Sequence, residues 1–153
     1  MSFLLQLDDD KLEDIIPLLD RYEKKCAAAE PIFKIEGHRL EEVMRTLPHY
    51  QSSYDQTYQE LKSLEDWILN IKDKKVGKLW KKYNEGYSRQ LSTKDIQMYI
   101  AGEKEIVELN QIIIEVVALK NNFNAIVEAL KQMGWMAGHM TKLRVSEIQD
   151  AIL

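Results

Sequence analysis

The sequence has little cysteine, glycine or proline, and each shortage narrows what the chain can be. Among 153 residues there are six Gly, three Pro and one Cys. So few turn-forming residues argue against an all-β fold and favour long uninterrupted helices. The single Cys26 excludes an internal disulfide, and no His lies at zinc-ligand spacing from it. The length suits one domain, or a short N-terminal element followed by a helical body.

Long apolar runs and catalytic motifs are also missing. The longest apolar run, residues 112–119, contains Glu115 and is far too short to span a bilayer. The opening "MSFLLQLDDD" lacks the basic start of a signal peptide, so we expect a soluble protein of the cytoplasm. No GxxxxGK[ST], GxGxxG, HExxH, GxSxG or CxxC motif occurs, and the three His lie far apart. We therefore expect no enzyme activity, no cofactor and no metal site.

Apolar residues recur at helical spacing over most of the chain. A first helix is predicted from Asp8 to about Cys26, or from Pro17 if this proline occupies the first turn. Pro31 and Gly37 interrupt the pattern, and "IFKI" between them is predicted to be extended. The chain should therefore start with a helix and an irregular link.

The next part of the chain is predicted to hold two helices separated by a proline. A short helix covers about 38–47, Pro48 ends it, and a long helix runs from Pro48 to about Asn84. Apolar and aromatic side chains step by three or four residues along the long helix: Tyr50, Tyr54, Tyr58, Leu61, Leu64, Ile68 and Ile71. Such a stripe is expected to pack against a second helix.

One internal loop is expected between Asn84 and Lys94. Gly86 is a suitable C-cap for the helix before it, and Ser92 or Thr93 is a suitable N-cap for the helix after it. Because the loop is short, the two helices that it joins should form a hairpin.

The last long helix is predicted from Lys94 to about Met133, after which Gly134 and Gly138 punctuate a final helical segment. A heptad-like seam runs along it: Ile112, Val116, Leu119, Phe123, Ile126, Leu130 and Met133. Further apolar residues widen this seam beyond what a two-helix hairpin can cover. We therefore assign the seam to self-association of the chain.

Charge is distributed unevenly along the chain. The net charge is −4, yet residues 71–90, "IKDKKVGKLWKKYNEGYSRQ", contain seven Lys/Arg and two acids. On an ideal helix five lysines fall within about 120° of one another, and the apolar and aromatic residues fall on the opposite side. We call these five the lysine face: Lys74, Lys75, Lys78, Lys81 and Lys82.

The lysine face has two interpretations. It is either a solvated side of an amphipathic helix or a surface that follows the phosphates of a nucleic acid strand. Trp80 and Tyr83 should pack behind it, whereas Tyr87 and Arg89 in the loop are free to contact a base. Repetition of the surface around an oligomer would turn weak contacts into strong binding, despite the acidic total.

Two segments resemble a known family, the UvsY family of phage recombination mediator proteins. The first ends in a K-x-x-x-x-Y-x-x-G pattern formed by Lys78, Tyr83 and Gly86, after a start proline and a tyrosine-rich helix. The second is "ALKQMGWMAGHMTKLR", with Gly134 followed by an aromatic residue, then His139 and Arg144. The resemblance covers about residues 36–150, so we divide the chain into an acidic N-terminal helical extension (1–35) and a helical DNA-binding and oligomerisation domain (36–153).

The resemblance implies a non-enzymatic mediator that assembles as a homo-oligomeric ring. Its partners would be single-stranded DNA, the single-strand DNA-binding protein and a RecA-like recombinase, which it would help to load. The family motif assigns DNA binding to Lys78, Tyr83 and Gly86. The C-terminal segment would carry assembly, with Trp135 beside two glycines, Gly134 and Gly138, that allow helices to approach closely.

Other functions remain possible at this stage. A coiled-coil scaffold that binds only proteins would explain the overall acidity. A protein of the membrane surface could use the same lysines on anionic lipid, although we expect no membrane partner. A further hypothesis is that the acidic N-terminal helix competes with DNA for the lysines or contacts a basic partner.

Overall fold

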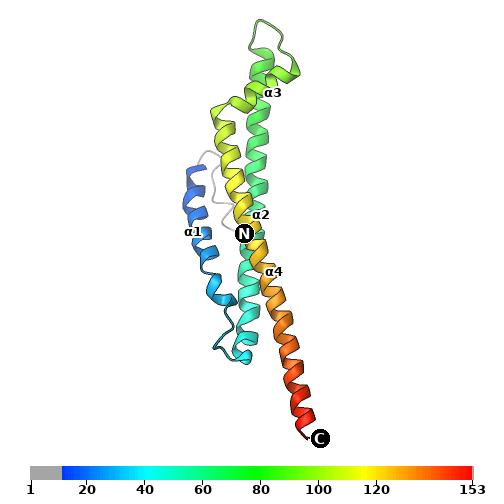
Figure 1. Cartoon of the computed structure of the whole chain (residues 1–153). Coiled ribbons are helices and arrows are strands. Elements are labelled where there is room, and N and C mark those ends of the chain that lie inside the picture. The colour runs from blue at the N-terminus through cyan, green and yellow to red at the C-terminus, as the bar shows by residue number, and fades with distance from the viewer. Residues whose placement is uncertain (1–11, 153) are drawn as a thin grey trace.

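A computed structural model describes residues 12–152 as an elongated helical hairpin (Figure 1). In chain order the elements are η2 (Leu12–Asp14), α1 (Ile15–Ala27), η3 (Glu30–Phe33), α2 (Leu40–Glu85), α3 (Thr93–Gly102) and α4 (Lys104–Ile152). These residues form no strand, and none of their helices is long and apolar enough to cross a lipid bilayer. The expected all-α fold built on long helices is confirmed.

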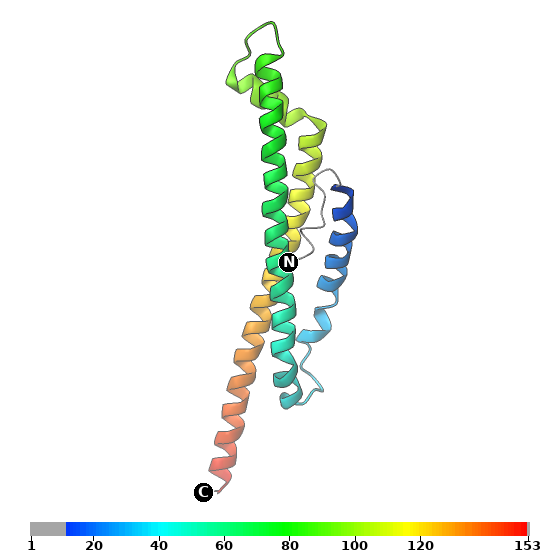
Figure 2. The same ribbon diagram turned by 180° about the vertical axis from the view of Figure 1, so that it is seen from behind.

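The two longest helices, α2 and α4, lie side by side and run in opposite directions, as both views show (Figures 1 and 2). Lys120 of α4 pairs with Glu65 near the middle of α2, whereas Lys75 near the end of α2 pairs with Glu105 at the start of α4. The predicted stripe lines this contact: Tyr54, Leu61, Leu64, Ile68 and Ile71 are all buried. Burial of so much apolar surface is the main source of stability for the hairpin.

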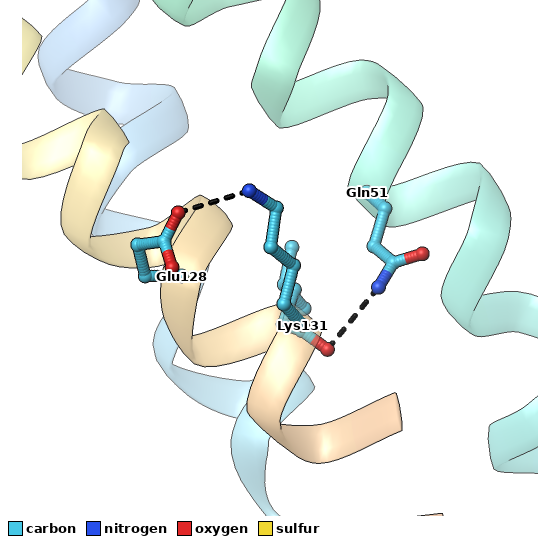
Figure 3. Close-up of polar contacts among 4 residues, drawn as sticks. Gln51, Glu128 and Lys131 are labelled. Carbon is cyan, nitrogen blue, oxygen red and sulfur yellow. Dashed lines mark hydrogen bonds and ion pairs between the residues drawn. The ribbon is translucent and has the colours of Figure 1, made fainter. Parts of the chain in front are cut away.

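A hydrogen bond from a side chain to the backbone marks where α2 and α4 approach each other near the other end of the hairpin. Gln51 Nε2 donates to the carbonyl oxygen of Leu130 at 3.3 Å, while Lys131 pairs with Glu128 on the outside of α4 (Figure 3). A bond from a side chain to the opposite backbone requires the two helices to lie close together. It therefore fixes the register of α4 on α2 in this region.

Pro48 does not end a helix, contrary to the sequence prediction. Helix α2 is continuous from Leu40 to Glu85, with Pro48 inside it and exposed to solvent. Proline removes one backbone hydrogen bond, but Leu47 and Tyr54 on either side of it are buried in the same core. Packing of both flanking segments thus outweighs the local cost, and the two predicted helices are one.

The predicted helix from Lys94 to Met133 is divided in two. Helix α3 ends at Gly102, Glu103 is extended, and α4 begins at Lys104. The N-cap prediction is confirmed, because the Ser92 hydroxyl oxygen accepts a hydrogen bond from the Asp95 backbone N–H at 3.2 Å. At the other end the predicted interruption at two glycines is wrong, since α4 runs through both without a break.

Helix α1 packs along the hairpin and belongs to the same core. Ile15, Leu18, Leu19 and Tyr22 are buried, and the Tyr22 ring meets Phe123 of α4 edge-on at 6.3 Å. This explains why α4 can carry more apolar residues than α2 alone could cover. The division of the chain at residue 35 stays a prediction.

Polar contacts fix α1 on the first half of α2. Lys25 Nζ donates to the Ser53 carbonyl oxygen at 3.0 Å and to Thr57 Oγ1 at 2.7 Å, and Tyr22 donates to Glu60. Burial lowers the pKa of Lys25 from its ordinary value. These contacts lie before the lysine face in α2. The start of the predicted acidic helix lies outside the described residues, and its competition with DNA stays a prediction.

The link between α1 and α2 differs from the prediction in one respect. Ile32 and Phe33 belong to the short 3-10 helix η3, so "IFKI" is not an extended piece throughout. Gly37 makes the predicted turn with a φ of 81°, which a residue with a Cβ adopts at a cost.

Candidate nucleic-acid interface

The lysine face lies on the last turns of α2. Lys74, Lys78, Lys81 and Lys82 are exposed, whereas Lys75 is half-buried. With a rise of 1.5 Å per residue, the exposed lysines extend over about 12 Å of the helix axis. Residues on the other side of this helix segment pack on the core, which prevents the helix from turning its lysines inward: Ile71, Val76, Leu79, Trp80 and Tyr83. The prediction that Trp80 and Tyr83 pack behind the lysines is confirmed.

The lysines of this face differ in their partners. Lys75 Nζ lies 3.6 Å from a carboxylate oxygen of Glu105, and Lys82 Nζ lies 5.6 Å from the centre of the Tyr83 ring. Lys78 and Lys81 form no ion pair or hydrogen bond with any residue that the structure describes. Their charges are therefore the most available for an external anion.

Tyr83 is held rigidly behind this surface. It is buried, and its hydroxyl donates a hydrogen bond to Glu103 at the junction of α3 and α4. This bond to a carboxylate is the main reason that the pKa of Tyr83 is raised to about 12. Because the hydroxyl is occupied by this bond, the hydroxyl edge of the ring is not free for a ligand. The DNA-binding role that the motif assigns to Tyr83 stays a prediction, and the structure shows a packing role.

Gly86 ends α2 and has a structural reason to be glycine. Its backbone N–H donates to the Lys82 carbonyl oxygen at 2.9 Å, which confirms the predicted C-cap. A Cβ at this position would lie 2.5 Å from that same oxygen. Any larger residue would therefore move the start of the loop, and with it Tyr87 and Arg89. No observation tests a direct contact of Gly86 with DNA.

The loop residues that were predicted to reach a base are exposed. Arg89 is exposed, and Tyr87 is 54% exposed, with its ring stacked on Tyr83 at 5.8 Å. The structure adds two residues that sequence reasoning missed, Tyr99 and Met98 of α3, at 52% and 66% exposure. The pattern gave no signal for them, because α3 was predicted to be the start of α4 rather than a separate helix that folds back.

The heptad-like seam lies mostly inside the chain. All its residues except Ile112 are buried, and Phe123 packs against Tyr22 and Tyr54 of the same chain. The spacing correctly indicated burial, but α1 and α2 provide the covering surface. The inference that this seam lies on the surface for a second subunit is therefore corrected.

A group of exposed apolar side chains lies at the C-terminal end of α4. Trp135 is 69% exposed and Leu143 is 64% exposed, with Met136, Met140 and Val145 nearby. Met136, Met140 and Leu143 recur at spacings of four and three, so they share one side of the helix. We call residues 134–147 the hairpin foot.

The two glycines of the hairpin foot have different surroundings. A Cβ on Gly134 would lie 3.1 Å from Leu47 Cδ2, so this glycine permits close approach of α2 and α4 within the chain. Nothing lies within 4 Å of the Cβ position of Gly138. Gly138 therefore leaves an open place on the helix, where the predicted approach of another helix stays untested.

The end of α4 projects beyond α2. Thr141 contacts Met44 close to the start of α2, and α4 continues to Ile152 (Figure 1). At 1.5 Å per residue α4 runs about 16 Å past Thr141, and α2 accompanies it for only about 6 Å of this length, from Met44 back to Leu40. A helix that extends past the other helices of its chain and exposes an apolar side is suited to contact other subunits.

Comparison with known proteins shows the fold. No protein-family model and no curated protein matches the sequence. Two crystal structures of the bacteriophage T4 recombination mediator protein UvsY are similar to the chain. The lattice type IV structure has a TM-score of 0.69 and 13% identity, over 82% of this chain and 98% of that one. The lattice type II structure has a TM-score of 0.66 and 14% identity, over 90% and 97%. The resemblance predicted from the two motifs is thus confirmed at the level of fold.

Proposed function

We propose that the protein is a non-enzymatic recombination mediator that binds single-stranded DNA. In this proposal it acts as a homo-oligomeric ring in the cytoplasm of an infected host cell. It helps to load a RecA-like recombinase onto DNA that is covered by single-strand-binding protein. The similarity in fold to UvsY supports the general role.

The main support for DNA binding is the exposed pair Lys78 and Lys81, which form no ion pair or hydrogen bond with the described part of the chain. Lysines that meet phosphates release counterions, so binding depends on their number and on the salt concentration rather than on base sequence. In a ring the same face recurs once per subunit along one strand. Apparent affinity can then exceed that of a single subunit by about 10²–10⁴.

The exposed apolar side chains of the hairpin foot support the proposed ring. Trp135, Met140 and Leu143 are exposed large side chains at the end of the molecule opposite the lysine face. Association through the hairpin foot would cover them and leave the lysine face of every subunit free. The proposed oligomerisation surface is thus this foot rather than the seam from Ile112 to Met133.

The test of DNA binding is the anisotropy of a labelled oligo-dT at increasing salt. Affinity should fall steeply between about 50 and 200 mM salt. In the double variant Lys78→Ala, Lys81→Ala, the slope of log K against log salt should decrease by about 0.7 for each lysine lost per bound subunit. The matched control is Lys24→Ala, Lys62→Ala, which removes two exposed lysines away from the face. A flat salt response, or equal affinity of both double variants, would refute the proposal.

The mediator role needs a second measurement. On single-stranded DNA coated beforehand with single-strand-binding protein, the wild-type protein should shorten the lag before a RecA-like recombinase starts to hydrolyse ATP. The double lysine variant should leave the lag long.

A protein-only scaffold is the competing function, because the net charge of −4 opposes DNA binding by a single chain. Light scattering during size exclusion, with and without a labelled strand, separates the two. A complex that excludes the strand at low salt supports the scaffold.

A further inference from the structure

Three tyrosines from two helices and a loop gather beside the lysine face. Tyr83 lies in the last turn of α2, Tyr87 follows in the loop, and Tyr99 lies on α3. The Tyr87 ring is 5.8 Å from that of Tyr83 with 19° between their planes, and the Tyr99 ring is 5.6 Å away with 16°. Tyr83 is thus the shared neighbour of two nearly parallel rings, in offset-stacked geometry.

The two outer tyrosines of this group, Tyr87 and Tyr99, are exposed to solvent. Tyr87 and Tyr99 keep about half of their surface in solvent, and Met98 beside Tyr99 is even more exposed. Each outer ring packs on Tyr83 on one side only, so much of its remaining surface meets water. Exposed apolar groups that cluster usually mark a binding surface.

The group is also ordered before any ligand arrives. The hydrogen bond from Tyr83 to Glu103 fixes the central ring, and this ring orients the other two. The Tyr83 hydroxyl donates its proton to Glu103, so the contact that orders the central ring comes from within the chain. A preorganised surface loses little entropy on binding.

We propose that Tyr87, Tyr99 and Met98 form a platform on which unpaired nucleobases stack, with Tyr83 as its positioning residue. Flat, parallel, solvent-facing rings match the faces of nucleobases, which every base possesses regardless of sequence. Lys82 lies over the Tyr83 ring, and Arg89 is in the same loop. Cations next to aromatic rings favour a ligand that has both bases and phosphates. This inference rests on the proposed function and adds Tyr99 and Met98 to it.

The platform can be separated from the lysine face with two strands of equal length. One is oligo-dT and the other is an abasic strand with the same phosphates and no bases. The wild-type protein should bind oligo-dT more tightly than the abasic strand, by about five- to a hundredfold for each stacked base. Binding of both strands should weaken with salt, because both carry the same charge.

Variants then locate the effect. Tyr99→Ala and Tyr87→Ala should lose much of the preference for oligo-dT and keep abasic binding, whereas Tyr99→Phe, which keeps the ring, should retain the preference. Tyr99→Leu keeps an apolar side chain without a ring, so it should also lose the preference for oligo-dT and keep abasic binding, and it provides the test if the alanine variant is poorly folded. The double lysine variant should weaken binding to both strands equally.

The outcomes distinguish this inference from the proposed function. Equal binding of both strands by wild type, with a steep salt response, overturns the platform and leaves DNA binding in place. Binding to neither strand overturns both. If Tyr99→Leu weakens both strands alike, or weakens only the recombinase contact, the platform is also refuted.

Discussion

The two ends of the hairpin carry opposite kinds of surface. The end of α2, the loop and α3 expose cations and stacked rings, and Lys78 and Lys81 pair with none of the residues that the structure describes. The hairpin foot exposes large apolar side chains on a helix that extends beyond its neighbour. One core of aliphatic and aromatic residues lies between them, so the two proposed binding surfaces are separated along the length of the hairpin.

This separation explains how an acidic chain can suit a nucleic acid. The net charge of −4 describes the whole molecule, but a strand meets only the local field within about 8 Å at physiological salt. If the feet of several subunits associate, the lysine faces are multiplied while the acidic surfaces stay elsewhere. Strong DNA binding by the lysine faces then depends on assembly through the foot, because one lysine face alone binds weakly.

The largest expected effect comes from breaking the foot. The double variant Met140→Glu, Leu143→Glu places two charges on its exposed apolar side and should dissociate the oligomer, as measured by light scattering. Loss of avidity should then lower the apparent affinity for oligo-dT by about a hundredfold or more, although no lysine is changed.

The control for this comparison is Ile16→Glu on α1. Ile16 is equally an exposed apolar residue, but it lies away from the foot. This variant should keep the oligomer and its affinity for DNA. If the foot variant keeps its oligomeric state, or if Ile16→Glu dissociates it, the assignment of assembly to the foot is wrong.

Sequence patterns predicted the hairpin better than its details. The stripe of α2 and the seam of α4 correctly indicated burial, because helical periodicity reports which side of a helix is covered. Periodicity does not say by which element, and the seam was assigned to a second subunit although α1 and α2 cover it. The prediction that Pro48 ends a helix was wrong, since packing of the residues on both sides of it keeps α2 continuous.

The candidate site shows a similar limit. The lysine face and the rear packing of Trp80 followed from the angles of a helical wheel. Tyr99 could not be predicted, because its place beside Tyr83 depends on the break at Glu103. The close approach at Gly134 is likewise a contact between residues far apart in the chain, which local spacing does not report.

A smaller effect concerns the rigidity of the lysine-bearing end. Tyr83→Phe removes the hydrogen bond to Glu103 and should lower the midpoint of thermal unfolding at pH 7. In the unfolded chain tyrosine has its ordinary pKa of about 10, and in the folded chain that of Tyr83 is about 12. The stabilisation is therefore present below pH 10 and is lost as the pH rises toward 12.

The measurement is the difference in melting temperature between wild type and Tyr83→Phe across this pH range. Taking the difference cancels the contribution of Tyr22 and Tyr54, whose pKa values are also raised by burial. The gap should narrow between pH 10 and 12. A gap that is constant with pH would mean that the Glu103 bond does not stabilise the fold.

The smallest effect distinguishes lysines within one face. Lys75 already pairs with Glu105, so it contributes little to the release of counterions when DNA binds. Both side chains are partly exposed, so loss of this ion pair costs little stability. Lys78→Ala should therefore reduce the salt slope of oligo-dT binding by about 0.7 per bound subunit, and Lys75→Ala by clearly less. In a Glu105→Gln background, Lys75 is free to contact phosphate. There Lys75→Ala should reduce the salt slope as much as Lys78→Ala does. Equal slopes for Lys75→Ala and Lys78→Ala in the wild-type background would show that the pair with Glu105 does not persist on DNA, and that the whole face acts as a diffuse positive surface.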